Sequence, residues 1–295
     1  MKKTVFLMAM LLVGSIAIFL DSPYSPSAQA NPTITKMRAE HLDSVEAYLS
    51  DDGMIFSVFY SRLDESPRHT FLYHSQKMRA ASMIKVFILG KAMQQIQAGA
   101  MRLEDNVILT DDDKVGGSGV LTGYEEGTTI SIYDLLFLMI TESDNTATNI
   151  MIDYLGMDQI NRYIAEAGYS DTILQRKMMD FDAVAEGREN YTSVYDLGTF
   201  FARLYDHQCV SPQYDNLMIE ILKGQADTEG IPTALPNAIV AHKTGELGGV
   251  YNDGGIVFDE HDSILVCMTD DYPSREDAIA SVINVSRYLV YDFEK

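Results

Sequence analysis

Strand-forming and helix-forming segments are segregated along this chain, and their order limits the folds that it can adopt. Five segments rich in β-branched and aromatic residues predict strands, two near the start and three near the end: 54–60, 70–73, 238–244, 249–258 and 263–269. Six segments between them have apolar residues at helical spacing: 82–97, 131–141, 145–154, 157–167, 194–204 and 216–222. Amphipathic segments outside the strands predict two more helices: 35–49 and 274–289.

Strands from both ends of a chain share one sheet most simply when the middle of the chain folds as an insertion. The order therefore predicts an α/β fold of the α+β kind, a five-stranded antiparallel sheet flanked by N- and C-terminal helices with an all-helical lobe inserted. We assign residues 31–78 and 225–295 to the sheet lobe and residues 79–224 to the helical lobe. A crevice between two such lobes is a natural place for a site.

Residues 1–30 have the pattern of a secretory signal peptide. Lys2 and Lys3 precede an apolar stretch over residues 5–20, and Ala28-Gln29-Ala30 forms a small-x-small cleavage site. Cleavage there predicts a secreted, extracytoplasmic protein of residues 31–295 with no membrane attachment. The alternative is an uncleaved anchor, because the stretch of about 16 apolar residues approaches the ~17–25 that span a bilayer.

Composition excludes several classes of partner and cofactor. The net charge of −21, from 43 acidic and 22 basic residues, repels nucleic acid and anionic lipid. Asp111–Asp113 lacks the spaced ligands of a calcium loop, so we expect a solvated turn there and no metal or cofactor.

Cys209 and Cys267 lack the spacing of metal ligands. We expect them to be buried as small hydrophobic side chains, with a disulfide between them as the alternative. We expect a monomer.

The first motif that indicates chemistry is Ser82-Met83-Ile84-Lys85. Residues three apart at the start of a helix share one face, so the two polar side chains can touch. A serine hydroxyl becomes a good nucleophile when a base takes its proton, and a lysine is that base when burial lowers its pKa. An S-x-x-K motif alone carries little weight, since a chain of this size has about one by chance.

The second motif, Ser143-Asp144-Asn145, lies between two predicted helices, which favours exposed side chains. Ser143 could pass a proton to a leaving nitrogen, and Asn145 could hold a substrate amide. Asp144 is expected to cap the following helix. The alternative is a helix cap with no catalytic role.

The third motif, Lys243-Thr244-Gly245, ends a predicted strand. A strand edge beside the nucleophile would align an extended, peptide-like substrate, with the lysine and threonine on its carboxylate and the glycine allowing close approach. The alternative is an ordinary strand and turn. Either of these two tripeptides has only ~5% chance of occurring in such a chain, and both after an S-x-x-K in this order ~0.1%.

Together the three motifs resemble those of a class A β-lactamase-type serine hydrolase, of the β-lactamase and penicillin-binding protein superfamily. The resemblance spans nearly all of residues 31–295 and implies a serine hydrolase acting on amide bonds, with a β-lactamase/transpeptidase-like fold. It implies the nucleophile Ser82, the proton partner Lys85 and the proton shuttle Ser143. It further implies substrate-binding Asn145, Lys243, Thr244 and Gly245, and an oxyanion hole of the backbone N–H groups of Ser82 and Glu246.

One segment departs from the resemblance. Class A enzymes have a glutamate soon after the position of Arg176, with an asparagine four residues on, which activates the water that releases the acyl group. No glutamate stands there, and Glu186, four before Asn190, lies too near the end of the loop. Asp180 and Asp182 are possible substitutes, but their side chains are one methylene shorter. Acyl release is therefore in doubt.

Three hypotheses for function remain. The first is a secreted enzyme that is acylated at Ser82 by β-lactams and hydrolyses their amide bond. The second is a penicillin-binding or D-Ala-D-Ala peptidase-like acyl-enzyme, acting on acyl-D-Ala-D-Ala-like substrates, that releases β-lactams poorly because the loop glutamate is missing. The third, from another class, is a noncatalytic cell-envelope binding module.

Overall fold

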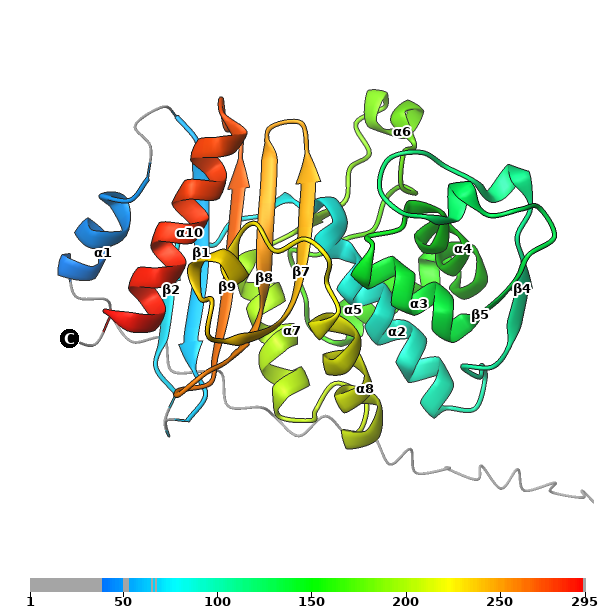
Figure 1. Cartoon of the computed structure of the whole chain (residues 1–295), viewed down its shortest axis with the longest axis horizontal. Coiled ribbons are helices and arrows are strands. Elements are labelled where there is room, and N and C mark those ends of the chain that lie inside the picture. Colours follow the sequence, from blue (N-terminus) through cyan, green and yellow to red (C-terminus); the bar gives the residue numbers. More distant parts are fainter. Residues whose placement is uncertain (1–38, 50–52, 65, 67, 294–295) are drawn as a thin grey trace, which may run out of the picture. The chain divides into compact units, whose positions relative to one another are not determined.

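The computed structural model describes residues 39–49, 53–64, 66 and 68–293. The predicted leader and its cleavage site lie outside these residues. Five strands form one antiparallel sheet in the order β2-β1-β9-β8-β7 (Figure 1). Their bounds are β1 (Ile55–Arg62), β2 (Thr70–Tyr73), β7 (Ile239–Leu247), β8 (Val250–Phe258) and β9 (Ser263–Asp270). The predicted α+β fold with a five-stranded antiparallel sheet is confirmed.

The two faces of the sheet pack against different helices because side chains alternate along each strand. Leu265 and Cys267 of β9 pack with residues of α1 (Ala39–Glu46) and α10 (Arg275–Tyr291). Ile264 and Val266 point the other way and pack with α2 (Lys85–Gln97) and α7 (Val194–Tyr205). Each face therefore has its own apolar core.

Helices occupy most of the chain between β2 and β7. In Figure 1 most of them lie beyond the β7 edge, whereas α7 packs against the face of the sheet. The hydrophobic helix α2 runs through their core, and Val86, Ile88 and Leu89 are fully buried. Around it stand α3 (Ile132–Thr141), α4 (Asn145–Leu155), α5 (Met157–Glu166) and α8 (Pro212–Lys223). The short elements are β3 (Met78–Arg79), β4 (Asn106–Ile108), β5 (Thr129–Ser131), β6 (Tyr191–Thr192), α6 (Phe181–Ala185) and α9 (Ile231–Ala234).

Several local predictions need correction. Ser82 does not begin the α-helix: it lies in a 3-10 turn, η1 (Ala81–Ile84), and α2 begins at Lys85. The 3-10 turn η2 (Asp111–Asp113) lies where a solvated turn was expected, whereas η3 (Leu121–Gly123) and the short strands and helices were not predicted. Cys209 and Cys267 form no disulfide within the described residues, because Cys209 packs against the helical core and Cys267 lies on the α10 face.

No helix within the described part of the chain is both long and apolar enough to cross a bilayer.

Candidate active site

The turn that bears Ser82 is held against the edge of the sheet. Ala81 has a left-handed backbone (φ 46°), an uncommon conformation for a residue with a Cβ, and Ser82 is half-buried. Asn252 of β8 donates through its side-chain amide to the carbonyl oxygens of Arg79 and Ala80, at 3.1 and 3.3 Å. Contacts to the backbone on the N-terminal side of Ser82 thus fix where its hydroxyl lies.

Lys85 follows one turn later and is fully buried. Its Nζ donates to the carbonyl oxygen of Ser143 at 2.6 Å, to the Ser143 hydroxyl at 3.1 Å and to Oδ1 of Asn145 at 3.0 Å. Burial, and then the nearby charge of Lys243, lower the pKa of Lys85 well below its ordinary value, against the opposing effect of Asp144. A neutral amine at this position can accept a proton.

Lys243 approaches Ser143 from the sheet side. It is also fully buried, and its Nζ donates to the Ser143 hydroxyl at 3.1 Å and to the Thr244 carbonyl at 2.8 Å. Burial lowers the pKa of Lys243 to about 7, while the charges of Asp227 and Asp253 act in the opposite direction. One hydroxyl therefore stands between two buried amines of low pKa, which is the geometry a proton shuttle requires.

The loop between α3 and α4 holds the second motif. Ser143 has φ 51°, and Asp144 caps α4 by accepting from the Ala147 N–H, as predicted. The other oxygen of Asp144 accepts from the backbone N–H groups of Val120 and Leu121. Asp144 and Asn145 are buried, so the expectation of exposed side chains is wrong for both, because the segment around η3 covers them.

Asn145 has its carbonyl oxygen on Lys85 and donates from Nδ2 to the Gly116 carbonyl at 3.1 Å. A carboxamide nitrogen carries two hydrogens, so one remains for a bound amide. Asn149, one turn later on α4, accepts from the Met178 N–H and donates to the Met178 carbonyl oxygen. Asn149 was not predicted from the sequence, where its only signal is the i+4 spacing from Asn145 on one helix face.

The third motif forms the outer edge of the sheet next to Ser82. A Cβ on Gly245 would lie 3.0 Å from the backbone nitrogen of Ser82 and 3.1 Å from the carbonyl oxygen of Ala80. The glycine thus allows β7 to approach the turn that bears Ser82, whereas close approach of a substrate there stays a prediction. Thr244 is buried, whereas Glu246 is exposed and forms a bidentate ion pair with Arg275 of α10. The three motifs, far apart in sequence, meet at one place.

Within the described residues, none of the three carboxylates considered as a water base is hydrogen-bonded to a residue of the three motifs. Met178 is buried, and a Cβ on Gly117 would meet both the Met179 sulfur and Nδ2 of Asn145. Asp180 uses an oxygen to cap α6 by accepting from the Ala183 N–H, and Asp182 is exposed on that helix. Glu186 is exposed and forms an ion pair with Arg188. The Met179 sulfur therefore lies beside Gly117, next to the side-chain amide of Asn145.

Arg176 and Glu189 form an ion pair that closes this segment at its base, with Arg176 Nε 2.8 Å from the nearer carboxylate oxygen. Asn190 accepts from the backbone N–H groups of residues 175 and 176 and donates to the Arg176 carbonyl. Asn190 is thus a structural anchor of this segment.

His242 lies on the opposite face of β7 from Lys243, as alternation along a strand predicts. It is buried and bonds through Nδ1 to Oδ1 of Asp253 at 2.7 Å. Within the residues that the structure describes, no cluster of three or more His, Cys, Asp or Glu side chains could hold a metal.

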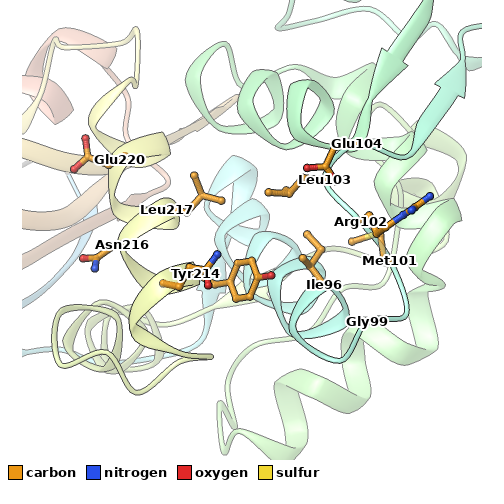
Figure 2. A pocket seen from close by; sticks show the side chains of 11 residues that line it. Ile96, Gly99, Met101, Arg102, Leu103, Glu104, Tyr214, Asn216, Leu217 and Glu220 are labelled. Atoms are coloured by element: carbon orange, nitrogen blue, oxygen red, sulfur yellow. The ribbon is translucent and has the colours of Figure 1, made fainter.

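A cavity of about 530 Å³ lies elsewhere, between the end of α2 and α8 (Figure 2). Ile96, Leu103, Tyr214 and Leu217 form part of its wall, and no residue of the three motifs lines it. The cavity is therefore not the place where the motif residues meet.

Comparison with known proteins agrees with this geometry. Residues 39–293 match the model of the β-lactamase enzyme family. A β-lactamase from Proteus vulgaris is 26% identical over 211 residues, which cover 69% of this chain and 76% of that protein. The crystal structure of a β-lactamase from Sphaerobacter thermophilus is 28% identical, with a TM-score of 0.78 over 84% of this chain and 95% of that one.

A structure of PBP-A, 24% identical, has the same fold, with a TM-score of 0.79 over 86% of this chain and 96% of that one. The family match spans the whole range of described residues, from 39 to 293, and both structures share the fold over most of the chain. The chain therefore belongs to the β-lactamase enzyme family, the serine β-lactamase-type hydrolases that act on amide bonds.

Proposed function

We propose that this protein is acylated at Ser82 by β-lactams and by acyl-D-Ala-D-Ala-like amides, and that it releases a β-lactam-derived acyl group slowly. It would act as a penicillin-binding enzyme more than as an efficient β-lactamase. A leader at residues 1–30 would place the protein outside the cytoplasm. We expect it to act there as a monomer.

The acylation step uses the groups that meet at the site. Neutral Lys85 takes the Ser82 proton as Oγ attacks the carbonyl carbon, and the oxyanion forms beside the backbone N–H groups of Ser82 and Glu246. The proton passes from Lys85 through the Ser143 hydroxyl to the leaving nitrogen, which breaks the C–N bond. Lys243 and Thr244 hold the substrate carboxylate, and the second Nδ2 hydrogen of Asn145 holds its amide.

One observation carries the proposal of slow release: Met178 is buried, and its backbone N–H and carbonyl oxygen are both hydrogen-bonded to Asn149, one turn after Asn145 on α4. Deacylation by water needs a base near the ester, and a thioether is a very weak acceptor. A variant of PBP-A, of the same fold, is known as an acyl-enzyme complex with penicillin G, so this architecture can hold a penicilloyl group.

Intact-mass spectrometry after mixing with penicillin G tests the proposal. We expect the mass to rise by that of one intact penicillin within minutes and to persist for hours, and Ser82→Ala to show no rise. Rapid return to the starting mass, with product accumulating, would instead establish an efficient β-lactamase. No adduct and no turnover in folded protein would indicate a noncatalytic binding module.

A further inference from the structure

Glu246 is the first exposed residue of β7 after the buried stretch that carries the third motif. Residues 240–245 are buried, and Glu246 follows them directly. Side chains alternate along a strand, so those of Thr244 and Glu246 lie on the same face, two residues apart. β7 is the outer strand of the sheet, and a Cβ on Gly245 would lie 3.0 Å from the Ser82 nitrogen. A group bound by Thr244 beside Ser82 therefore has Glu246 as its neighbour along the strand.

Arg275, the first residue of α10, is the cation that Glu246 contacts. Its Nε donates to Oε1 of Glu246 at 2.8 Å and its Nη2 to Oε2 at 3.0 Å, a bidentate, charge-assisted pair. The same Nη2 donates to the carboxylate of Glu229, in the turn before α9. Tyr251 stands directly across from Glu246 in the sheet register, and the guanidinium carbon lies 5.8 Å from the centroid of its ring. Three side chains of the protein thus hold this guanidinium.

The three charged side chains leave an excess of negative charge next to Thr244. At pH 7 the carboxylates of Glu246 and Glu229 share one guanidinium, which leaves one formal negative charge. The side chains of Glu246, Arg275 and Glu229 are 44%, 37% and 55% exposed, so solvent weakens their field. Residues two apart in a strand are nevertheless separated by only about 7 Å, which is less than the Debye length of about 10 Å at 0.1 M salt. An anion held by Thr244 would feel this charge.

We propose that Glu246 is a specificity-determining residue: its carboxylate engages Arg275 and adds a negative charge beside the position of the substrate carboxylate. The protein therefore accepts acyl compounds with a neutral amide or ester at that position, together with those that carry a free carboxylate. The substrate class extends to acyl peptides whose terminal carboxyl group is amidated. This inference rests on the proposed role of Lys243 and Thr244 in holding the carboxylate.

The test uses penicillin G, which carries a free carboxylate, and its methyl ester, which does not. Intact-mass spectrometry gives the rate constant for adduct formation with each compound, and the ratio of acid to ester measures selection for the carboxylate. We expect both compounds to label the native protein. Glu246→Gln keeps the size of the side chain and the backbone N–H but removes the charge. It should raise the ratio about fivefold, as expected for a partly screened charge at this range.

Arg275→Gln breaks the same ion pair and should have the opposite effect. It leaves Glu246 and Glu229 without their cation, so the ratio should fall about fivefold. If the ion pair served only to hold the structure, the two variants would change the ratio in the same direction. Raising NaCl from 0.02 to 0.5 M should reduce both effects to less than twofold, because salt screens exposed charges.

Glu276→Gln is the matched control. Glu276 is exposed, directly follows Arg275 and accepts from the Ser274 hydroxyl, so its substitution removes an equal charge from the same turn of α10. The ratio should stay within about twofold of that of the native protein. An equal rise in Glu276→Gln and Glu246→Gln would mean that total charge, and not the contact with Arg275, sets the ratio, and this would overturn the inference.

The outcomes separate this inference from the proposed function. If penicillin G labels the native protein but its ester does not, or if folded Glu246→Gln has an unchanged ratio, the inference alone is overturned. If neither compound labels folded native protein, the proposed function is overturned and the inference with it. Glu246 and Arg275 both reach the surface, and Arg275→Gln carries the test by itself if Glu246→Gln does not fold.

Discussion

At the scale of single residues, the site depends on two lysines that are both buried and both easier to deprotonate than lysine in water. Their environments separate their roles. Burial and the charge of Lys243 both lower the pKa of Lys85, with Asp144 acting in the opposite direction, whereas the charges of Asp227 and Asp253 both raise the pKa of Lys243 against burial. The first is thus suited to be a base and the second a cation, although their side chains are chemically identical.

The pH dependence of acylation follows from this difference. Acylation needs Lys85 neutral, so the rate rises with pH through the lowered pKa of Lys85. It needs Lys243 cationic, and that form is present below its pKa of about 7 and is lost above it. We expect the rate constant kcat/KM for acylation to fall above pH about 7. Lys243→Arg should move this alkaline limb up by at least two units in stopped-flow measurements with a fluorescent penicillin. An alkaline limb at the same pH in Lys243→Arg would assign it to another group.

Met178 offers a direct test of why acyl release is slow. Met178→Glu should place a carboxylate near the ester and speed loss of the penicilloyl adduct at least tenfold, followed by intact mass over time. Met178→Gln, of similar size and without a base, is the matched control. The buried carboxylate should also lower the free energy of unfolding by about 1–3 kcal/mol. Equal release rates for the two variants would show that the missing base is not the cause.

At the scale of elements, the sequence predicts long, regular segments well and strained or short ones poorly. Residues 194–204 match α7 (Val194–Tyr205) to within one residue, because apolar residues recur there at helical spacing. The predicted start of α2 was wrong because Ala81 has a left-handed backbone, so Ser82 lies in a 3-10 turn before the helix. Asn252 of β8 holds this backbone through the Ala80 carbonyl oxygen. No local pattern carries such a tertiary constraint.

The same limit applies to the site. The three motifs could be read from sequence because each is short and contiguous. The roles of Asn149 and Asn252 could not be predicted from sequence, since they depend on helix facing and on the register of the sheet. For residues 178 and 179 the sequence showed only that neither is the expected glutamate. Their placement against Asn149 and Gly117 required the structure.

Packing of α7 on the sheet depends on one glycine. A Cβ on Gly198 would lie 2.5 Å from the ring of Phe59 on β1, and that ring is buried and cannot move away. Gly198→Ala should therefore lower the free energy of unfolding by about 1–3 kcal/mol, despite the better helix propensity of alanine. Gly123→Ala is the control, because a Cβ added at Gly123 would have no neighbour within 4 Å among the described residues. Denaturant unfolding of both variants measures the difference, and equal stabilities would contradict the packing argument.

At the scale of the whole molecule, the fold and the charge have separate functions. The sheet carries β7 and the helical part carries Ser82, Lys85 and Ser143, so the site forms only when both are folded and in contact. Surface carboxylates repel one another across the folded molecule and are farther apart in the unfolded chain.

This repulsion should be measurable as a salt dependence of stability. With a net charge of −21 at pH 7, screening by salt should raise the melting temperature by about 2–4 °C between 0.01 and 0.2 M NaCl, corresponding to ~1 kcal/mol. Near the isoelectric point of about 4.5 the net charge vanishes, and the same addition of salt should leave the melting temperature almost unchanged. Differential scanning calorimetry at the two pH values makes the comparison within one protein. A rise of equal size at both would mean that salt acts on hydrophobic burial and not on net charge. The acidic surface would then carry no measurable cost in stability.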